Sequence, residues 1–387
     1  MDFSESEEIT GLREMLRRYR ARECSTEKVE RWDREDFIPR DELKRLGDLG
    51  ICGLCIPEQY GGLGRNVLGM VAAIEELGRC SAGLASYYFM CAGYGGLNIT
   101  ESGSVAQKER FLPDLAAGNI AFSYGLSEPN VGADLGAVAT RAERDGDRIR
   151  INGAKRWTSA ASMNDYIYAL VRSGPASDKR KNLSFILIPT GTKGVSVTVL
   201  SAMGHNGVPL ADVVFEDVEL SVDDVVGGEA GWNNGWSVLA GPALEVEKLG
   251  PPAIALGIAE AALDEAWGYS QQRVQGGKHI CGHQAVRHVL SNSRTQLQAA
   301  RLMLSNAAWL VQEGKPSAVA TSMAKLFVTE NAKDVTLSCQ QVMGAYGYAH
   351  GFQMQRYVRD VLAITIYGGS SAIQRNNIAN LLQLPKE

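Results

Sequence analysis

The sequence predicts an α+β protein built from three consecutive units, helical at both ends and composed of β-strands in the middle. In the outer regions, apolar residues recur three and four positions apart, which is the spacing of helices packed on one face. The central region holds short β-branched runs separated by Gly, Pro, Ser and Asp. We therefore predict an N-terminal helical domain at 1–118, a middle β domain at 119–226 and a C-terminal helical domain at 227–387.

The N-terminal unit is predicted to be helical because of three periodic segments, at 12–23, 42–50 and 70–79. Glycine-rich turns separate these segments. Its glycines at 93, 95 and 96 do not follow a predicted strand. They therefore lack the context of a dinucleotide-binding loop.

The middle unit is predicted from five short, near-alternating runs, at 147–153, 165–171, 183–189, 195–200 and 211–220. Strands this short and this closely spaced are typical of a small barrel or sandwich. Helical periodicity returns after the turn that contains Gly227 and Gly228. It continues through three long segments, at 254–272, 297–314 and 319–343.

Charge and cysteine content exclude several classes of protein. The chain has 387 residues and a net charge of −5, so it has no overall positive electrostatic field that would attract nucleic acid. It has no apolar stretch long enough for membrane insertion, and its first residues are acidic rather than basic and apolar. Seven cysteines in so long a chain do not resemble a disulfide framework. We therefore expect a cytoplasmic protein.

Two clusters with metal-ligating side chains are better explained structurally. Cys52 and Cys55 form a CxxC with no partner pair, which favours buried small side chains over zinc or redox chemistry. His279, His283 and His288 have no acidic ligand among them, so a polar turn and helix start is favoured. We expect no metal site.

Seven blocks carry a more specific signal, and they occur in one order along nearly the whole chain. They are PEQYGGLG (57–64), YGLSEPNVGADLGA (124–137), KRWTSAA (155–161), AMGHNGVP (202–209), RVQGGKHICGHQ (273–284), QVMGAYGY (341–348) and RYVRDVLAITIYGGSSAIQR (356–375). Together they resemble the acyl-CoA dehydrogenase family. The resemblance implies an N-terminal helical domain, a middle β domain and a C-terminal four-helix bundle, in agreement with the independent segmentation. It also implies noncovalently bound FAD, a homotetramer in which neighbouring subunits complete each flavin site, and an electron-transfer flavoprotein as partner.

The resemblance assigns one part of the flavin site to the middle domain. Its residues are Tyr124, Leu126, Ser127, Gly132, Ala133, Trp157 and Ser159. The first three would hold the pyrimidine edge, and Gly132 and Ala133 would approach the pyrophosphate. Ala133 stands where the family usually has Ser, so one hydroxyl contact is lost. Trp157 would lie against the flavin ring, the alternative being an ordinary core aromatic, and Ser159 would donate its hydroxyl near N(5).

The remaining cofactor contacts implied by the resemblance come from the C-terminal domain. Arg273 and Gln284 would reach the pyrophosphate and adenosine across the subunit interface. A guanidinium suits this role because it can form two parallel hydrogen bonds with phosphate oxygens. Gln341, Gly344 and Ala345 would form the adenine-side cradle of the neighbouring subunit. Ser370 matches the family's usual Thr.

The catalytic base is not where most family members have it. The family reaction removes an α-proton from an acyl thioester, which requires a desolvated carboxylate. Most members place this Glu after a Tyr near the C-terminus, whereas here Gly368 follows Tyr367. A minority, including isovaleryl-CoA dehydrogenase, carries it on an earlier helix, and that register falls on Glu247. Glu245 is the rival, but it points to the other side of the helix.

The same resemblance suggests which residues contact the substrate: Ala133, Leu244, Lys248, Tyr367 and Gly368. The backbone N–H of Gly368 would donate to the thioester carbonyl. We also expect the missing side chain at Gly368 to leave space for a branch or ring on the substrate. Pro251 and Pro252 have no N–H for the carbonyls of Glu247 and Lys248, so a continuous helix must be kinked or opened there.

The sequence thus predicts FAD-dependent α,β-dehydrogenation of a short, branched or cyclic acyl-CoA, with Glu247 as the base. Two alternatives remain open. One is a dehydrogenase or oxidase acting on an acyl group bound to a carrier protein. The other is a family member without dehydrogenase activity, acting as a binding subunit of a larger complex.

Overall fold

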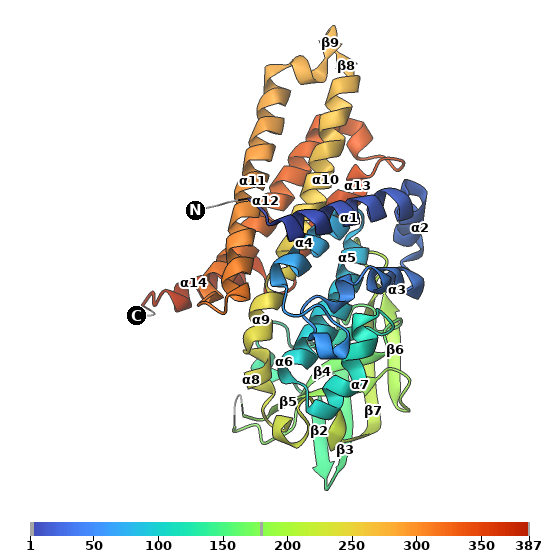
Figure 1. Ribbon diagram of the computed structural model, residues 1–387, viewed down its shortest axis with the longest axis vertical. Helices are drawn as coiled ribbons and strands as arrows, with labels where there is room; N and C mark the ends of the chain where they lie inside the picture. Colours follow the sequence, from blue (N-terminus) through green and yellow to red (C-terminus); the bar gives the residue numbers. More distant parts are fainter. Residues whose placement is uncertain (1–3, 179–180, 386–387) are drawn as a thin grey trace.

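The computed structural model describes residues 4–178 and 181–385. Figure 1 shows an elongated molecule with the β-sheet at one end, a bundle of long helices at the other and the N-terminal helices packed between them. The predicted order of helical, β and helical units is confirmed. Within the described ranges, no helix is both long and apolar enough to cross a membrane.

The N-terminal unit contains seven α-helices and one π-helical segment among its described residues. They are α1 (Glu7–Glu23), α2 (Thr26–Glu35), α3 (Arg40–Asp48), α4 (Val67–Gly78), α5 (Ala82–Phe89), the π-helix η3 (Met90–Leu97), α6 (Asn98–Ser102) and α7 (Val105–Ala116). Serine side chains start several of these helices by accepting a backbone N–H, as Ser6 does for α1 and Ser104 for α7. Helix α4 is buried along almost its whole length and lies at the centre of the molecule.

The middle unit is one mixed sheet of seven strands. The strands are β1 (Phe122–Gly125), β2 (Arg141–Asp145), β3 (Arg148–Lys155), β4 (Tyr166–Arg172), β5 (Leu183–Pro189), β6 (Val195–Leu200) and β7 (Leu210–Ser221). Their order is β1-β4-β2-β3-β7-β6, and β5 pairs with β4 outside this path. All five predicted strands are present. The sequence did not indicate β1, which has four residues, or β2, whose sequence RAERD is mostly charged.

The C-terminal unit contains the predicted four-helix bundle. Its elements are α8 (Gly235–Leu239), α9 (Pro242–Glu247), α10 (Gly250–Gln272), the hairpin strands β8 (Val274–Gln275) and β9 (Lys278–His279), α11 (Gln284–Gln312), α12 (Ala318–Met343), α13 (Met354–Ile364) and α14 (Ser371–Leu381). Helices α10, α11, α12 and α13 pack on one another. The β8–β9 hairpin lies at the end of the bundle remote from the sheet (Figure 1).

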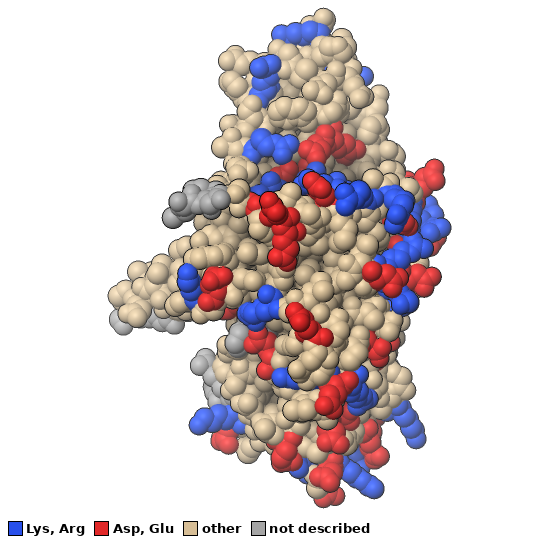
Figure 2. Space-filling model, viewed as in Figure 1, with Lys and Arg blue, Asp and Glu red and all other residues tan. Residues whose placement is uncertain are grey.

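A buried ion-pair network joins the N-terminal unit to the bundle. Glu75 of α4 is 2% exposed and pairs with Arg13 of α1 at 2.7 Å and with Arg301 of α11 at 2.5 Å. Arg301 also pairs with Glu260 of α10, at 3.1 Å. Figure 2 shows basic and acidic side chains side by side along the middle of the molecule, where α1 lies. The buried charges stay ionised because each has partners of opposite sign.

Candidate active site

The candidate base lies at a break between two helices. Helix α9 ends at Glu247, and α10 starts at Gly250 with Pro251 and Pro252 in its first turn. Proline has no N–H, so the carbonyls of Glu247 and Lys248 receive no bond from the residues four positions later. The helix is therefore opened at this point, as the two prolines predict, and Glu247 projects from a helix terminus.

Glu245, the rival for the role of base, is already occupied. One of its carboxylate oxygens pairs with Lys248 Nζ at 2.8 Å, and the other accepts the hydroxyl of Thr321. Lys248 is 8% exposed, so its charge is held close to this carboxylate. Both oxygens of the Glu245 carboxylate therefore already have partners within the chain. Lys248, which the resemblance placed at the substrate, pairs with Glu245 in this structure.

Glu247 lies among aromatic side chains instead. The Tyr124 hydroxyl hydrogen-bonds to its carboxylate, and its charge also acts on the hydroxyls of Tyr94 and Tyr168. Burial raises the pKa of Glu247 to about 7, although the Tyr124 hydrogen bond and the Lys248 charge oppose this rise. A carboxyl group with such a pKa is a much better proton acceptor near neutral pH than an ordinary glutamate.

The turn that contains Gly368 packs directly against the start of α10. Gly368 has φ +61°, and a Cβ added there would lie 2.9 Å from Pro251 Cγ. The expectation that the missing side chain leaves space for the substrate is therefore wrong. The ring of Pro251 occupies the space that the first side-chain carbon at this position would need.

A buried lysine holds the same turn from the other side. Lys325 of α12 is fully buried, and its Nζ donates to the Ile364 carbonyl at 2.5 Å and lies 6.0 Å from the centroid of the Tyr367 ring. Burial lowers the pKa of Lys325 to about 8. Among the described residues, the buried hydroxyl of Tyr367 has no hydrogen-bond partner. The Tyr367 ring meets the His205 ring edge-on, with 5.5 Å between the centroids.

Another buried ion pair fixes the loop after β1, where the resemblance places flavin contacts. Glu128 pairs with Lys155 at 2.8 Å and accepts the backbone N–H groups of Ala139 and Thr140. The loop between Glu128 and Ala139 includes Gly132 and Ala133, which are both exposed. A Cβ at Gly132 would meet no atom within 4 Å, so this loop presents bare backbone to the outside.

The segment after β3 lies beside the end of β1. Lys155 Nζ donates to the Leu126 carbonyl at 3.2 Å, and the Arg156 N–H donates to the Ser127 carbonyl at 2.9 Å. Trp157 follows at φ +63°, with its side chain 54% exposed and the Arg156 guanidinium 4.8 Å from its ring. The reading of Trp157 as a core aromatic is therefore wrong. Ser159 is partly exposed nearby in sequence.

These features fit a flat, phosphate-bearing cofactor. An exposed indole held in a left-handed backbone conformation offers a stacking surface, and the open Gly132 loop offers close approach to phosphate.

The other predicted cofactor residues lie at the opposite end of the bundle. The Arg273 guanidinium is 5.5 Å from the Tyr346 ring centroid, which places Arg273 beside the segment of Gly344 and Ala345. Gln284 and Gln341 are exposed on helices that end there. Helix α10 separates this group from Glu247 by 23 residues, or about 33 Å at the rise of an α-helix. One chain therefore does not bring both groups to one flavin.

Ser370 has a local role. Its hydroxyl accepts the backbone N–H of Ile373 at 3.4 Å and caps α14. The hydroxyl is partly exposed beside Gly368 and Gly369, and the cap orients it at the end of the active-site turn.

The two sequence clusters with metal-ligating side chains lie in different surroundings. Cys52 and Cys55 are buried, and His279, His283 and His288 lie on the hairpin and at the start of α11. Among residues 4–178 and 181–385, no three His, Cys, Asp or Glu side chains converge on a possible metal position.

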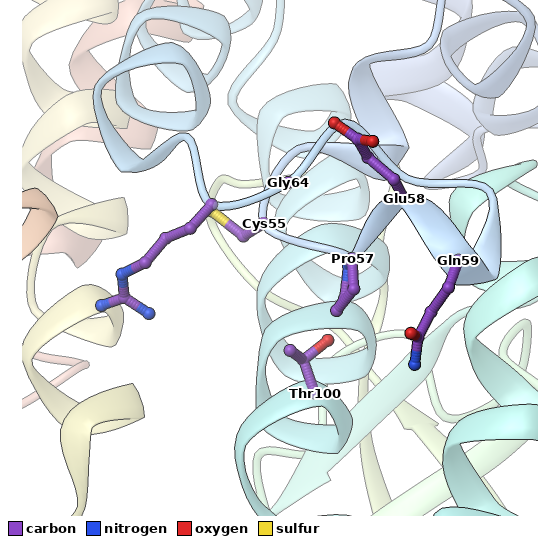
Figure 3. A pocket seen from close by; sticks show the side chains of 7 residues that line it. Cys55, Pro57, Glu58, Gln59, Gly64 and Thr100 are labelled. Atoms are coloured by element: carbon purple, nitrogen blue, oxygen red, sulfur yellow. The ribbon is translucent and has the colours of Figure 1, made fainter.

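A cavity of about 570 Å³ opens in the N-terminal unit, away from these groups. Figure 3 shows side chains from the PEQYGGLG loop around it, with Thr100 facing them from α6. Glu247 is not among its lining residues, which are Cys55, Pro57, Glu58, Gln59, Gly64, Arg65 and Thr100.

The fold and this arrangement define a flavin-dependent acyl thioester oxidoreductase, and comparisons with known proteins agree. Family profiles of the acyl-CoA dehydrogenase N-terminal, middle and C-terminal domains match residues 6–119, 123–218 and 233–383. The chain belongs to the acyl-CoA dehydrogenase family. It is an oxidoreductase acting on acyl-CoA, and FAD is its cofactor.

Three similar proteins illustrate the range of the family. The structure of butyryl-CoA dehydrogenase from Megasphaera elsdenii superimposes with a TM-score of 0.94 at 30% identity, covering 99% of this chain and 100% of that one. A 3-(aryl)acrylate reductase from Clostridium sporogenes is 32% identical over 97% of this chain and 100% of its own length. The caffeyl-CoA reductase-Etf complex subunit CarC from Acetobacterium woodii is 30% identical over 99% of both chains.

The sequence pattern did not identify Tyr94 and Tyr168 near the base, or Lys325 beside the Gly368 turn. Tyr168 and Lys325 lie in a strand and a helix whose apolar periodicity explains them as core positions. Tyr94 had one signal, its position among three glycines.

Proposed function

We propose that this chain catalyses α,β-dehydrogenation of a short, branched or cyclic acyl-CoA and that Glu247 removes the α-proton. The observation that supports this proposal best is the contrast between two neighbouring carboxylates. Glu245 is ion-paired with Lys248, whereas Glu247 ends a helix among aromatic rings with its pKa raised to about 7. Gly368, at the family's usual position for the base, offers no carboxylate.

In the proposed reaction, the N–H of Gly368 donates to the thioester carbonyl and stabilises the charge that develops as the α-proton leaves. Glu247 accepts that proton, and the rings of Tyr94 and Tyr124 keep water from its carboxylate. Trp157 and the exposed loop at Gly132 would hold FAD, which supplies the hydride acceptor when bound. Lys325 keeps the Gly368 turn in place through the Ile364 carbonyl.

The test is substrate-dependent bleaching of the flavin. Purified holoenzyme is mixed without oxygen with propionyl-, butyryl-, isobutyryl- and isovaleryl-CoA, and the flavin absorbance is followed. We expect at least one of them to bleach the flavin within seconds. If none does, the chain is a binding subunit or acts on a carrier-bound acyl group. Oxygen consumption by the reduced enzyme then separates an oxidase from a dehydrogenase.

The rate of flavin reduction should depend on pH with a pKa near 7. Glu247 is active only when ionised, so below its pKa of about 7 the rate falls about tenfold per pH unit, and above it the rate is level. Stopped-flow reduction between pH 5.5 and 8.5 measures this profile. A rate that does not change over that range would contradict the assignment.

The same titration predicts a change in stability. An unfolded Glu ionises near 4.5, whereas Glu247 in the folded protein keeps its proton up to about pH 7. The folded state therefore binds more protons between these values, and stability falls as pH rises from about 4.5 to 7. Glu247→Gln lacks the titration and serves as the reference.

We also propose that the chain is a homotetramer and that Arg273, Gln284, Gln341, Gly344 and Ala345 complete a neighbouring subunit's cofactor site. The support is the separation of about 33 Å between this group and Glu247 along α10. The relative in a reductase-Etf complex supports an electron-transfer flavoprotein as redox partner.

Replacing Arg273 by Ala should weaken FAD binding by about tenfold to a hundredfold, because it deletes a charged partner of phosphate. FAD titration of the apoprotein, followed by flavin fluorescence, measures the change. Arg18→Ala, at an exposed position of α1, is the control and should bind FAD like the wild type. Equal affinity in both variants would remove Arg273 from the cofactor site.

A further inference from the structure

The π-helix η3 is a feature that the proposed function has not explained. Its glycines are required by packing: a Cβ at Gly93 would lie 2.4 Å from the Phe89 ring, and one at Gly95 would lie 2.3 Å from Leu115. A Cβ at Gly96 would lie 2.9 Å from Ile56. The large side chain among these glycines is Tyr94. π-helical turns are rare and are frequent at functional sites.

Tyr94 reaches the cluster around the base. Its ring centroid is 4.5 Å from that of Tyr124, whose hydroxyl bonds to Glu247. The hydroxyl of Tyr94 is close enough to feel the charge of Glu247 and the hydroxyl of Tyr367, and with burial these raise its pKa. Tyr94 therefore lies near both the base and Tyr367, the residue before Gly368.

Two aromatic rings, those of Phe89 and Tyr124, pack against Tyr94. Phe89 lies 5.0 Å away, ring centroid to ring centroid, and its ring approaches within 2.7 Å of the position of a Cβ at Gly250. Tyr124 is backed by Phe185, stacked at 6.0 Å. Phe89, Tyr94 and Tyr124 thus form an aromatic wall that extends from the helix break at Glu247 to the sheet. Such packed rings do not yield without cost.

We propose that Tyr94 is a specificity-determining residue that limits the acyl site to short acyl groups. The inference rests on the proposed function for the position of the substrate, whose α-carbon must contact Glu247. From that point an acyl chain extends toward the aromatic wall and ends against Tyr94. Butyryl and its branched isomers fit in front of the ring, whereas a straight chain of six or more carbons meets it.

The test measures binding and not turnover, so it is independent of the base assignment. S-Propyl-, S-butyl-, S-hexyl- and S-octyl-CoA are thioethers that have no acidic α-proton and cannot be dehydrogenated. Their affinity for FAD-saturated holoenzyme is measured by calorimetry in the wild type and in Tyr94→Ala, Tyr94→Leu and Tyr94→Phe. Tyr60→Ala, on the partly buried surface of another cavity, is the matched control.

We expect wild-type affinity to stop rising at butyl and to fall for octyl. In Tyr94→Ala, affinity should keep rising by about fourfold per added methylene through hexyl, because each buried methylene finds the vacated space. Tyr94→Leu should fall between the two, and Tyr94→Phe should keep the wild-type profile because it keeps the ring. Tyr60→Ala should also keep that profile.

Three results would overturn the proposal: a Tyr94→Ala profile equal to that of the wild type, wild-type affinity that rises through octyl, or no binding of any thioether. Failure of the proposed function can be distinguished from failure of this proposal. In that case acyl-CoA does not bleach the flavin, although the thioethers still bind. Tyr94→Leu covers the case in which Tyr94→Ala does not fold.

Discussion

Glu247→Gln should bind FAD and acyl-CoA almost normally and yet fail to reduce its flavin. The amide keeps the volume of the side chain and its hydrogen bond with Tyr124, but it does not accept the α-proton. Loss of a general base costs about a hundredfold to ten-thousandfold in rate. Anaerobic stopped-flow mixing with the best acyl-CoA of the panel measures this loss directly.

Glu245→Gln is the matched control, because it makes the same chemical change two residues away on the same helix. Its carboxylate pairs with Lys248 and accepts the hydroxyl of Thr321, so we expect it to take no part in proton removal. We expect the rate to stay within about threefold of the wild type, less than the usual effect of a general base. A Glu247→Gln variant that reduces its flavin at the wild-type rate would show that the base lies elsewhere. A large loss in Glu245→Gln alone would reassign the role.

The largest effect on stability is expected from Glu75→Gln. Burial raises the pKa of Glu75, but the ion pairs with Arg13 and Arg301 outweigh burial and lower it overall. Removing the charge leaves the buried Arg13 and the partly buried Arg301 each short of a partner. We expect a loss of about 3 kcal/mol, the lower end for a broken buried pair, because Arg301 keeps Glu260 and Arg13 keeps Glu5.

Urea unfolding of the FAD-saturated protein, followed by circular dichroism, measures the loss. Glu14→Gln, at an exposed position of α1, is the control and should change stability by less than about 0.5 kcal/mol. Since the folded-state pKa of Glu75 is lowered, the stabilising effect is present above pH 4.5 and is lost as pH falls through the folded-state value. Equal stability of the two variants at pH 7 would contradict the assignment of the network as a clamp between the units.

The sequence predicted well those features that depend on local pattern. Amphipathic periodicity marked the long helices, alternation marked five strands of the sheet, and the paired prolines at 251 and 252 indicated the opened helix beside Glu247. It did not indicate β1 and β2, because four residues or a charged run carry too little pattern.

Contacts between segments remote in sequence decided the rest. Gly368 and Pro251 are 117 positions apart, and only their packing shows that the proline ring fills the space that the missing side chain leaves. Trp157 is a large apolar residue of the kind that is usually buried, yet its side chain is 54% exposed and its backbone is in the left-handed conformation.

The sequence by itself determined the three-unit fold, the family and two candidate carboxylates, because periodicity and motif order are properties of neighbouring residues. The register of the resemblance favoured Glu247 over Glu245, but only the tertiary structure showed what surrounds each carboxylate. Lys248 and Thr321 bind the carboxylate of Glu245. Tyr94 from the N-terminal unit and Tyr124 from the sheet surround that of Glu247. A carboxylate's strength as a base is set by the charges and the water around it, and these depend on the fold.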